Sequence, residues 1–496
     1  MKYALAKDLT EQTKLWRIVR AMPKGALLHA HCSATIDFDN LFPVLLETPG
    51  MHIVGSASHL ATNEARENAP FWIGFKATAH ANTNIWSEEY NVGSPVPLTY
   101  AANAFPNSGR EGFQQWLRSR VTVTLEEATE QRHGIDHIWR KFAQCFTTLS
   151  MLIQYEPIWR AFLRQLMSAM AKDNVRWIEL RSGPFAIRRR VMDADSKKLV
   201  DHFINISYYK EGSESPEENL DALFVALDDE IQKFKATDEG KNFWGLRMIW
   251  ASMRGLPTEN LLDDMNKCIA IKLKFPHLIA GYDLVGPEDL GRPLKDLIPE
   301  LAWFREQCEI NGVNIPFFFH AGETLSTGGE TDHNLFDAIL MGTRRIGHGF
   351  SLYKHPTLVD MVREKAILIE SCPISNEILR YCSSILSHPL PALLARGVSC
   401  ALSNDDPTIL ETVGLSNDFW QALQGWESLS LAGLGSLAES SLRWAAFEDQ
   451  TDDEWHSGVT SRRLGDGLKA KRLREWDVDW ERFCQWIVDE FEEVDN

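Results

Sequence analysis

Cysteine is scarce in this chain of 496 residues, and the eight that occur form no Cys-x-x-Cys pair. Several of them lie within apolar segments, where a cysteine behaves as a small buried side chain. We therefore expect no disulfide framework, which favours a reducing, cytoplasmic location. The first ten residues also lack an apolar core of signal-peptide length, although a secreted form whose leader had been removed would look the same.

Two further absences narrow the class of partner. No apolar run is long enough to cross a bilayer, so no membrane partner is expected. Basic residues are outnumbered, with 51 Lys and Arg against 69 Asp and Glu and a net charge of -18. Because no basic stripe is present to neutralise phosphates, nucleic acid is excluded as a partner and a small-molecule substrate is favoured.

Eight apolar segments of strand length recur along the chain, and helical patterns such as 263–272 and 297–307 lie between them. The segments are 25–31, 175–181, 245–252, 278–286, 315–323, 344–349, 366–375 and 398–406. Strands that alternate with helices predict a parallel sheet, and eight such units predict a closed (β/α)8 TIM barrel of the α/β class. In this fold the reactive groups gather at the carboxyl ends of the strands.

The rest of the chain is organised around this predicted barrel of residues 25–450. A helical segment covers residues 1–24, and a helical tail covers residues 451–496. Residues 45–135 show little periodicity and follow the first strand, so we interpret them as an inserted subdomain or lid. In the tail, Trp476, Trp480 and Phe483 share one helical face, which predicts packing on the barrel or burial in a homodimer.

Histidines at two strand ends form a candidate metal site. His29 and His31 are two residues apart on a predicted strand, so their side chains point to the same face. His320 ends a second apolar strand, and Asp405 and Asp406 follow a third. Histidine and carboxylate ligands with room for a water favour a catalytic zinc or a similar ion over a structural one. Both aspartates can turn inward at a strand end, and the spacing alone does not decide which of them binds the metal.

Two more side chains are placed for proton transfer. Glu323 follows His320 after Ala321 and Gly322, whose small size lets the backbone turn so that the carboxylate re-enters the site. His348 lies between two glycines, which allow close approach by substrate or water. Each also has a structural interpretation, as a helix-capping glutamate and as a core histidine. Their occurrence together with the metal ligands at strand ends favours an active site.

Five motifs, taken in order, resemble the adenosine deaminase family. They are Met22-Pro-Lys-Gly-Ala-Leu-Leu-His-Ala-His31, His320-Ala-Gly-Glu323, Arg345-Ile-Gly-His-Gly349, Cys372-Pro-Ile-Ser-Asn376 and Ser403-Asn-Asp-Asp-Pro407. The opening Met-Pro-Lys-Gly and the long insert resemble the adenosine-deaminase-related growth factor branch of that family. The resemblance covers about residues 15–450.

This resemblance implies a zinc-dependent aminohydrolase that acts on adenosine or a close relative. Carried over by position, it implies one zinc ion bound by His29, His31, His320 and Asp405, catalytic roles for Glu323 and His348, and purine contacts for Asp406 and the backbone of Gly286. The zinc ion would lower the pKa of a bound water. Glu323 would donate a proton to ring N1, and His348 would take a proton from the water or orient it.

One departure from the family pattern bears on the substrate. The family commonly places an aspartate close after its first histidine pair, near the ribose, whereas here Cys32 follows His31 and no acid occurs before Asp37. The loss of that charge removes a repulsion against a 5′-phosphate, so a 5′-substituted adenosine such as AMP is a second candidate substrate. The insert also contains no cysteine, so the disulfide expected of secreted members of the branch cannot form there, which supports an intracellular form.

Two other functions are compatible with the same fold. One is another mononuclear metal-dependent amidohydrolase; the fourth predicted strand, 278–286, has no lysine of the kind that bridges dinuclear sites. The other is a non-catalytic signalling protein built on the deaminase fold. That alternative predicts the loss of a metal ligand or a proton-transfer residue, and none is missing.

Overall fold

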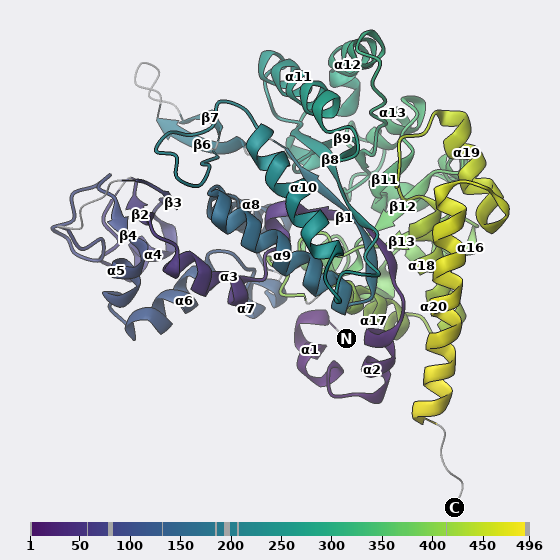
Figure 1. The fold of residues 1–496 in the computed structure, drawn as a ribbon, viewed down its shortest axis with the longest axis horizontal. Coiled ribbons are helices and arrows are strands. Elements are labelled where there is room, and N and C mark those ends of the chain that lie inside the picture. Colours follow the sequence, from purple (N-terminus) through teal and green to yellow (C-terminus); the bar gives the residue numbers. More distant parts are fainter. Residues whose placement is uncertain are drawn as a thin grey trace, which may run out of the picture.

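Eight parallel strands form the centre of the molecule in the computed structural model (Figure 1). The structure describes residues 2–56, 58–77, 83–130, 132–183, 186–192, 199–205, 208–412 and 414–491, with the backbone alone for 186–192 and 199–205. One sheet has the order β1 (Gly25–His31), β5 (Val175–Ser182), β8 (Gly245–Met253) and β9 (Ile279–Val285). The other has the order β10 (His320–Ala321), β11 (Arg345–His348), β12 (Leu368–Ser371) and β13 (Cys400–Leu402).

Single parallel bridges join the two sheets at both edges. Tyr282 in β9 pairs with Phe317 just before β10, and Ala30 in β1 pairs with Asp405 just after β13. The strand order therefore follows the chain order around a ring, as the (β/α)8 prediction requires. The predicted fold class is confirmed.

Helices separate successive strands and cover the ring from outside. They are α9 (Glu156–Lys172), α10 (Asp221–Lys235), α11 (Thr258–Lys274), α12 (Ile298–Ile310), α13 (Asn334–Leu340), α14 (Pro356–Glu364), α15 (Pro373–Ile378), α16 (Leu390–Ala395), α17 (Ser416–Gly425) and α18 (Leu431–Arg443). In α14, Pro356 starts the helix, and Leu358, Val359 and Val362 form the buried face at helical spacing. The last helix of this set, α18, packs on β1 and β13.

Three predicted strands are shorter than their apolar segments. In 315–323 only His320 and Ala321 form a regular strand, although Phe318 donates a backbone hydrogen bond to Tyr282. In 366–375 the strand stops at Ser371, because Pro373 begins α15. In 398–406 the strand stops at Leu402, ahead of the aspartates. The side chains of interest therefore lie just beyond the strands.

The segment between β1 and α8 (Gly134–Leu152) forms a small sheet and several helices to one side of the barrel (Figure 1). It contains an antiparallel sheet of order β3 (Phe71–Phe75), β2 (Met51–Gly55) and β4 (Val96–Pro97). Its helices are α3 (Phe38–Glu47), α4 (Asn63–Asn68), α5 (Leu98–Asn103), α6 (Gly109–Ser119) and α7 (Leu125–Thr129). Trp86, Phe105, Phe113 and Trp116 form contacting rings in this part. Strands of two to five residues are too short to produce visible periodicity in the sequence.

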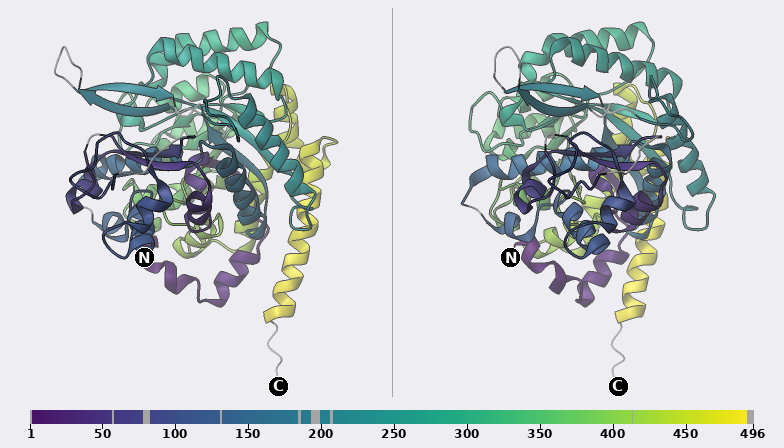
Figure 2. Two further views of the ribbon diagram at one scale, coloured as in Figure 1. Left: turned by 60° about the vertical axis from the view of Figure 1, so that its left-hand side comes forward. Right: turned by 90° about the vertical axis from the view of Figure 1, so that its left-hand side faces the viewer.

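A second addition follows β5 directly. The antiparallel hairpin of β6 (Ala186–Met192) and β7 (Leu199–Asn205) begins at the carboxyl end of that strand and extends outward (Figure 2). Short 3-10 helices complete the connections: η1 (Cys32–Thr35), η2 (Glu288–Leu290), η3 (Leu294–Leu297), η4 (Phe350–Lys354), η5 (Ile385–Ser387) and η6 (Arg462–Leu464).

The two ends of the chain lie against each other. After α1 (Tyr3–Thr10) and α2 (Lys14–Ala21), the main chain of Pro23 accepts a hydrogen bond from Trp476 Nε1 of α20 (Leu468–Phe491) at 3.1 Å. Arg17 forms an ion pair with Glu490, and α19 (Asp452–Ser461) packs beside α20. The tail thus contacts this chain's own barrel, and a homodimer contact stays a prediction.

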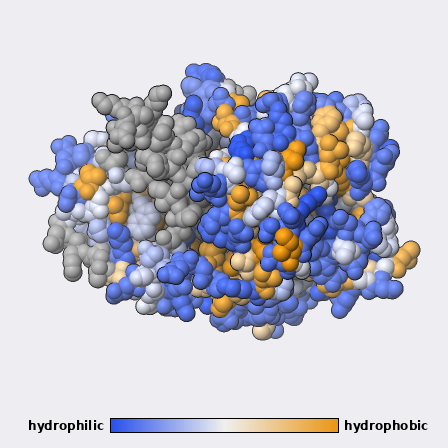
Figure 3. All heavy atoms as spheres, turned by 90° about the horizontal axis from the view of Figure 1, so that it is seen from above, coloured by the Kyte–Doolittle hydropathy of each residue, from blue (hydrophilic) through white to orange (hydrophobic). Residues whose placement is uncertain are grey.

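Among the described residues, every helix is too short or too polar to traverse a bilayer. The face in Figure 3 is mostly hydrophilic, with hydrophobic residues in separate small patches.

Candidate active site

Every predicted site residue lies at the carboxyl end of the barrel strands or just beyond it. His29 and His31 are in β1, His320 opens β10, His348 ends β11, and Asp405 follows β13. Backbone hydrogen bonds fix the last of these to the first strand: Asp405 N–H donates to the carbonyl of His29 at 3.1 Å, and His31 N–H donates to the carbonyl of Asp405 at 3.0 Å. The two ends of the barrel sequence therefore meet at the site.

Two of these residues have unusual backbone conformations. His348 has φ +60° and Asp405 has φ +57°, in the left-handed region that costs a non-glycine residue about 1–2 kcal/mol. Gly347, next to His348, must lack a side chain for a steric reason. A Cβ at this position would lie 2.8 Å from Cε1 of His29. The glycine before His348 thus makes room for the His29 ring.

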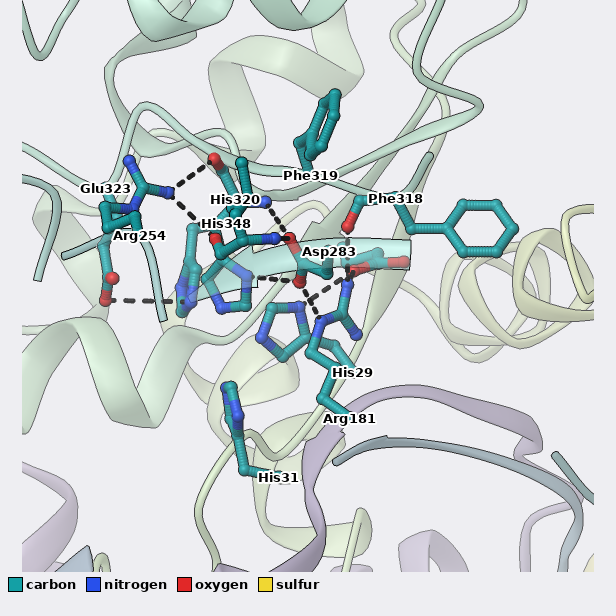
Figure 4. A network of polar contacts seen from close by, with 12 residues as sticks. His29, His31, Arg181, Arg254, Asp283, Phe318, Phe319, His320, Glu323 and His348 are labelled. Atoms are coloured by element: carbon teal, nitrogen blue, oxygen red, sulfur yellow. Dashed lines mark hydrogen bonds and ion pairs between the residues drawn. The ribbon is translucent and has the colours of Figure 1, made fainter. Parts of the chain in front are cut away.

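The four predicted metal ligands are brought together. One nitrogen from each of His29, His31 and His320 lies within 4.8 Å of the others. Asp405 Oδ1 lies 3.3 Å from His29 Nε2 and 3.4 Å from His31 Nε2. Figure 4 shows the three imidazoles converging, with His348 beside them. A second group of potential ligand atoms within 4.8 Å joins His29, His348, Cys372 and Asp405.

The protonation pattern of this cluster fits a bound cation. His29 Nδ1 is 2.8 Å from the buried carboxylate of Glu370, and His320 Nδ1 is 2.6 Å from that of Asp283. A carboxylate only accepts, so Nδ1 of each histidine carries the proton and Nε2 is a bare lone pair. His29 Nε2 and Asp405 Oδ1 then face each other at 3.3 Å as two buried acceptors without a hydrogen bond. A cation between them resolves this repulsion, and the donor set suits zinc.

Arg181 locks the two supporting carboxylates in place. Its guanidinium is fully buried, with Nε 2.7 Å from Asp283 and an Nη 2.5 Å from Glu370. Burial raises the pKa of both carboxyls, but this effect is outweighed by His320 and Arg181 beside Asp283 and by Arg181 and Arg345 beside Glu370. Each pKa is therefore held well below its usual range. Both groups are therefore ionised, as the histidine tautomers require.

The charge network continues away from the site. Glu370 also pairs with Arg345 at 2.5 Å, and Arg345 pairs with Glu179 at 2.7 Å. The Arg345 guanidinium lies over the Phe318 ring, 3.8 Å from its centroid. Sequence reasoning assigned no role to these residues, although a charged residue inside an apolar strand is a visible signal because burial requires a partner.

Glu323 is held at the mouth of the metal cluster. The backbone N–H groups of Gly322 and Glu323 donate to the carboxylate of Glu288, at 3.2 and 2.8 Å, which fixes the turn after His320. Glu323 Oε1 lies 3.7 Å from His348 Nε2. Burial, followed by the charges of Asp405 and Glu288, raises the pKa of the Glu323 carboxyl well above its ordinary value. The side chain is thus suited to hold a proton and release it.

Asp406 and Gly286 lie in the same cavity as the metal cluster. Asp406 is 1% exposed, and burial together with Asp405 raises the pKa of its carboxyl well above normal. Gly286 follows β9 with φ +104°, a conformation that favours glycine. Because glycine has no side chain, its backbone lines the cavity directly. The sequence leaves open which of the two aspartates binds the metal. The contacts of Asp405 with His29 and His31 favour Asp405 over Asp406.

The cavity has a volume of about 350 Å³ and two unlike walls. Trp139, Phe142 and Phe146 of α8 form an apolar wall, and Phe146 contacts the His31 ring edge-on at 5.6 Å between centroids. A second, polar wall belongs to α11 and β8. It comprises Ser252, Asn260, Asp263, Asp264 and Lys267. A flat heterocycle with a polar substituent matches this division.

An eight-stranded α/β barrel with histidines and acids at the carboxyl ends of its strands has the site layout of (β/α)8 barrel enzymes. Comparison with solved structures agrees on the fold. An adenine deaminase from Arthrobacter aurescens superposes with a TM-score of 0.54 at 16% identity, covering 92% of this chain and 99% of that one. An amidohydrolase from Burkholderia ambifaria with bound Zn gives a TM-score of 0.54 at 16% identity, covering 95% and 94%.

Sequence comparison is more specific. A family model described as adenosine deaminase matches residues 120–462. Adenosine deaminase 2-A of Danio rerio is 29% identical over 468 residues, covering 92% of this chain and 81% of that protein. Adenosine deaminase 2 of Homo sapiens is 30% identical over 453 residues, covering 90% and 79%. The chain belongs to the adenosine deaminase family, as the five motifs predict, and is an enzyme that deaminates adenosine-like substrates.

Proposed function

We propose that this protein is a zinc-dependent aminohydrolase that converts adenosine and water into inosine and ammonia. The observation that carries the proposal is the cluster of His29, His31, His320 and Asp405, in which buried acceptor atoms face one another. These four side chains would hold one zinc ion. When bound, zinc supplies a water molecule whose pKa is lowered toward neutrality.

Proton transfer to the purine falls to Glu323. Attack of water oxygen on C6 breaks the aromaticity of the ring, and a proton delivered to N1 compensates the charge that develops there. Glu323 is buried and beside His348, so its carboxyl holds a proton ready for this step. Asp406, which is equally buried, accepts or donates a hydrogen bond at the far edge of the purine, and the backbone of Gly286 offers a further polar contact.

Adenosine suits the two walls of the cavity. The α8 wall of Trp139, Phe142 and Phe146 packs against the purine face, and the polar wall accepts ribose hydroxyls. In the polar wall, Lys267 is already paired with Asp263 at 2.7 Å, so this lysine is not free to bind a phosphate.

AMP is the second candidate substrate. Cys32 lies in the cavity directly after the metal ligand His31, so a neutral thiol occupies the place where an acid would repel a 5′-phosphate. The ratio of kcat/KM for adenosine and AMP distinguishes the two. A strong preference for unmodified adenosine would eliminate AMP.

The alternatives differ in what they predict. Another mononuclear amidohydrolase would use the same metal cluster but turn over a different ring, and a non-catalytic signalling protein would turn over nothing.

A cytoplasmic location stays a prediction; all eight cysteines are free thiols in the structure, and seven are buried.

The test is the absorbance change from adenosine to inosine on zinc-loaded protein. We expect turnover that a chelator abolishes and added zinc restores. Glu323→Gln removes the proton donor but no ligand, so it should retain one zinc per chain and lose activity by at least about 100-fold. The exposed Glu309→Gln is the matched control and should behave as wild type. Loss of zinc in Glu323→Gln, or unchanged activity, would contradict the proposal.

A further inference from the structure

Three of the four histidines at the site have an identified partner at Nδ1, on the side of the ring away from the site, and these partners differ. Behind His29 and His320 are carboxylates, which leave Nε2 of each ring bare. Behind His348 is the side-chain amide of Asn376, whose Nδ2 lies 3.3 Å from His348 Nδ1. An amide nitrogen is a donor, so the pattern of protonation must be the opposite there.

The direction of hydrogen bonding is set by a backbone group at the far end. The N–H of Leu390 points at Nδ1 of the buried His388, at 3.1 Å. A backbone N–H only donates, so His388 Nδ1 carries no proton and its Nε2 does. Burial lowers the pKa of His388 to about 3, in agreement with a neutral ring. His388 Nε2 lies 3.0 Å from Asn376 Oδ1 and donates to it.

That contact fixes the amide of Asn376. Because its Oδ1 accepts from His388, its Nδ2 must be the atom that faces His348. The Asn376 backbone is anchored as well, since its carbonyl accepts from the N–H groups of Tyr381 and Cys382 at 2.9 and 3.2 Å. The amide is fully buried, so water does not compete for its hydrogen bonds. The three side chains form one chain of donors that starts at Leu390 and ends at His348.

We propose that Asn376 and His388 are positioning residues that hold His348 as the neutral tautomer with its proton on Nε2. That N–H faces Glu323 Oε1 at 3.7 Å and Asp405 Oδ2 at 3.8 Å, both beyond hydrogen-bond distance. The proton lies in the gap between them, where the attacking water would sit. His348 therefore donates to the water oxygen instead of accepting its proton.

The partner at Nδ1 also distinguishes the histidines that bind the metal, His29 and His320, from His348, which does not. His348 belongs to a group of atoms close enough to hold a metal together with His29 and Asp405. A nitrogen that carries a proton has no lone pair to give, so the Asn376 contact keeps His348 out of the ligand set while the carboxylates keep His29 and His320 in it. The role in catalysis rests on the proposed function; the tautomer is measurable without substrate.

The tautomer is measured by NMR of zinc-loaded protein labelled with 15N-histidine. The bare and the protonated ring nitrogens have well-separated shifts, and His348→Gln assigns the signals. We expect His348 with bare Nδ1 and protonated Nε2. Asn376→Asp replaces the donor by an acceptor and should move the proton to Nδ1, with a fall in kcat of about 10- to 100-fold and little change in KM.

A second pair of variants covers the case in which Asn376→Asp fails to fold. His388→Gln retains a donor for Asn376 Oδ1 and should preserve the His348 tautomer and most of kcat. His388→Leu removes that donor, so the tautomer should change and kcat should fall. A His348 signal with protonated Nδ1 in wild type, or an unchanged tautomer and kcat in Asn376→Asp, would overturn the inference. If the tautomer is as expected but adenosine is not deaminated, the proposed function fails and the inference about the tautomer stands.

Discussion

Asp264 is a carboxyl group whose burial should make the stability of this protein depend on pH. It lies in α11 with 4% of its surface exposed, and it accepts hydrogen bonds from Ser252 Oγ and, at 3.3 Å, from Trp250 Nε1. Burial raises its pKa to about 7, against the opposing effects of those two donors and Lys267. Its other oxygen, Oδ1, has no hydrogen-bond partner among the described residues.

The magnitude follows from the pKa shift. In the unfolded chain the group ionises near 3.8, and in the folded protein near 7, so between these pH values the folded state binds the proton more tightly. The stabilising contribution is therefore fully present below about pH 4 and is lost as pH rises to 7. A difference of about three pKa units corresponds to about 4 kcal/mol. Asp264→Asn has no proton to lose, so its stability relative to wild type should rise by up to that amount between pH 4 and 7.5.

Equilibrium urea unfolding of both proteins at several pH values measures this difference, since effects common to both cancel. Asp263→Asn is the matched control, because that neighbouring side chain is 65% exposed and its substitution should change little at any pH. A free-energy difference between Asp264→Asn and wild type that stays constant from pH 4 to 7.5 would refute the reasoning.

Two further substitutions test the support of the site and of the barrel. Glu370→Gln removes the charge that accepts the hydrogen bond from His29 Nδ1. Competition with a chelator should then show a zinc affinity lower by about 10- to 100-fold. An unchanged affinity would show that Glu370 does not support this ligand. Gly281→Ala places a Cβ 2.5 Å from the Phe318 ring and 2.6 Å from the Pro316 carbonyl. This clash should lower the free energy of unfolding by about 1–3 kcal/mol and lower the Tm. A Tm equal to that of wild type would contradict this packing.

The sequence predicts the barrel well because its strands are buried on both faces. Such strands appear as unbroken apolar runs, and eight of them lie where the structure has β1, β5 and β8 to β13. The strand ends then bring His29, His320 and Asp405 to one place by topology alone. This is why residues more than 370 positions apart could be assigned to a single site without any contact being known.

What the sequence does not reveal depends on partners across the barrel. Glu370, Asp283 and Arg181 are visible as charges within apolar strands, yet which carboxylate faces which histidine depends on strand register. The same holds for Asn376 and His388, whose contact with each other depends on the path of α15 and the loop after it. The structure of the insert cannot be predicted for another reason, because its strands are too short to show a hydrophobic period.

One zinc ion per chain, held by the four assigned ligands, is the claim on which the rest depends. Elemental analysis of purified wild-type protein and of His320→Ala, both dialysed against metal-free buffer, tests it most directly. The account predicts about one zinc per wild-type chain, with deamination of adenosine, and neither zinc nor activity in His320→Ala. An active wild-type protein without stoichiometric metal, or a His320→Ala variant that keeps its zinc, would contradict it.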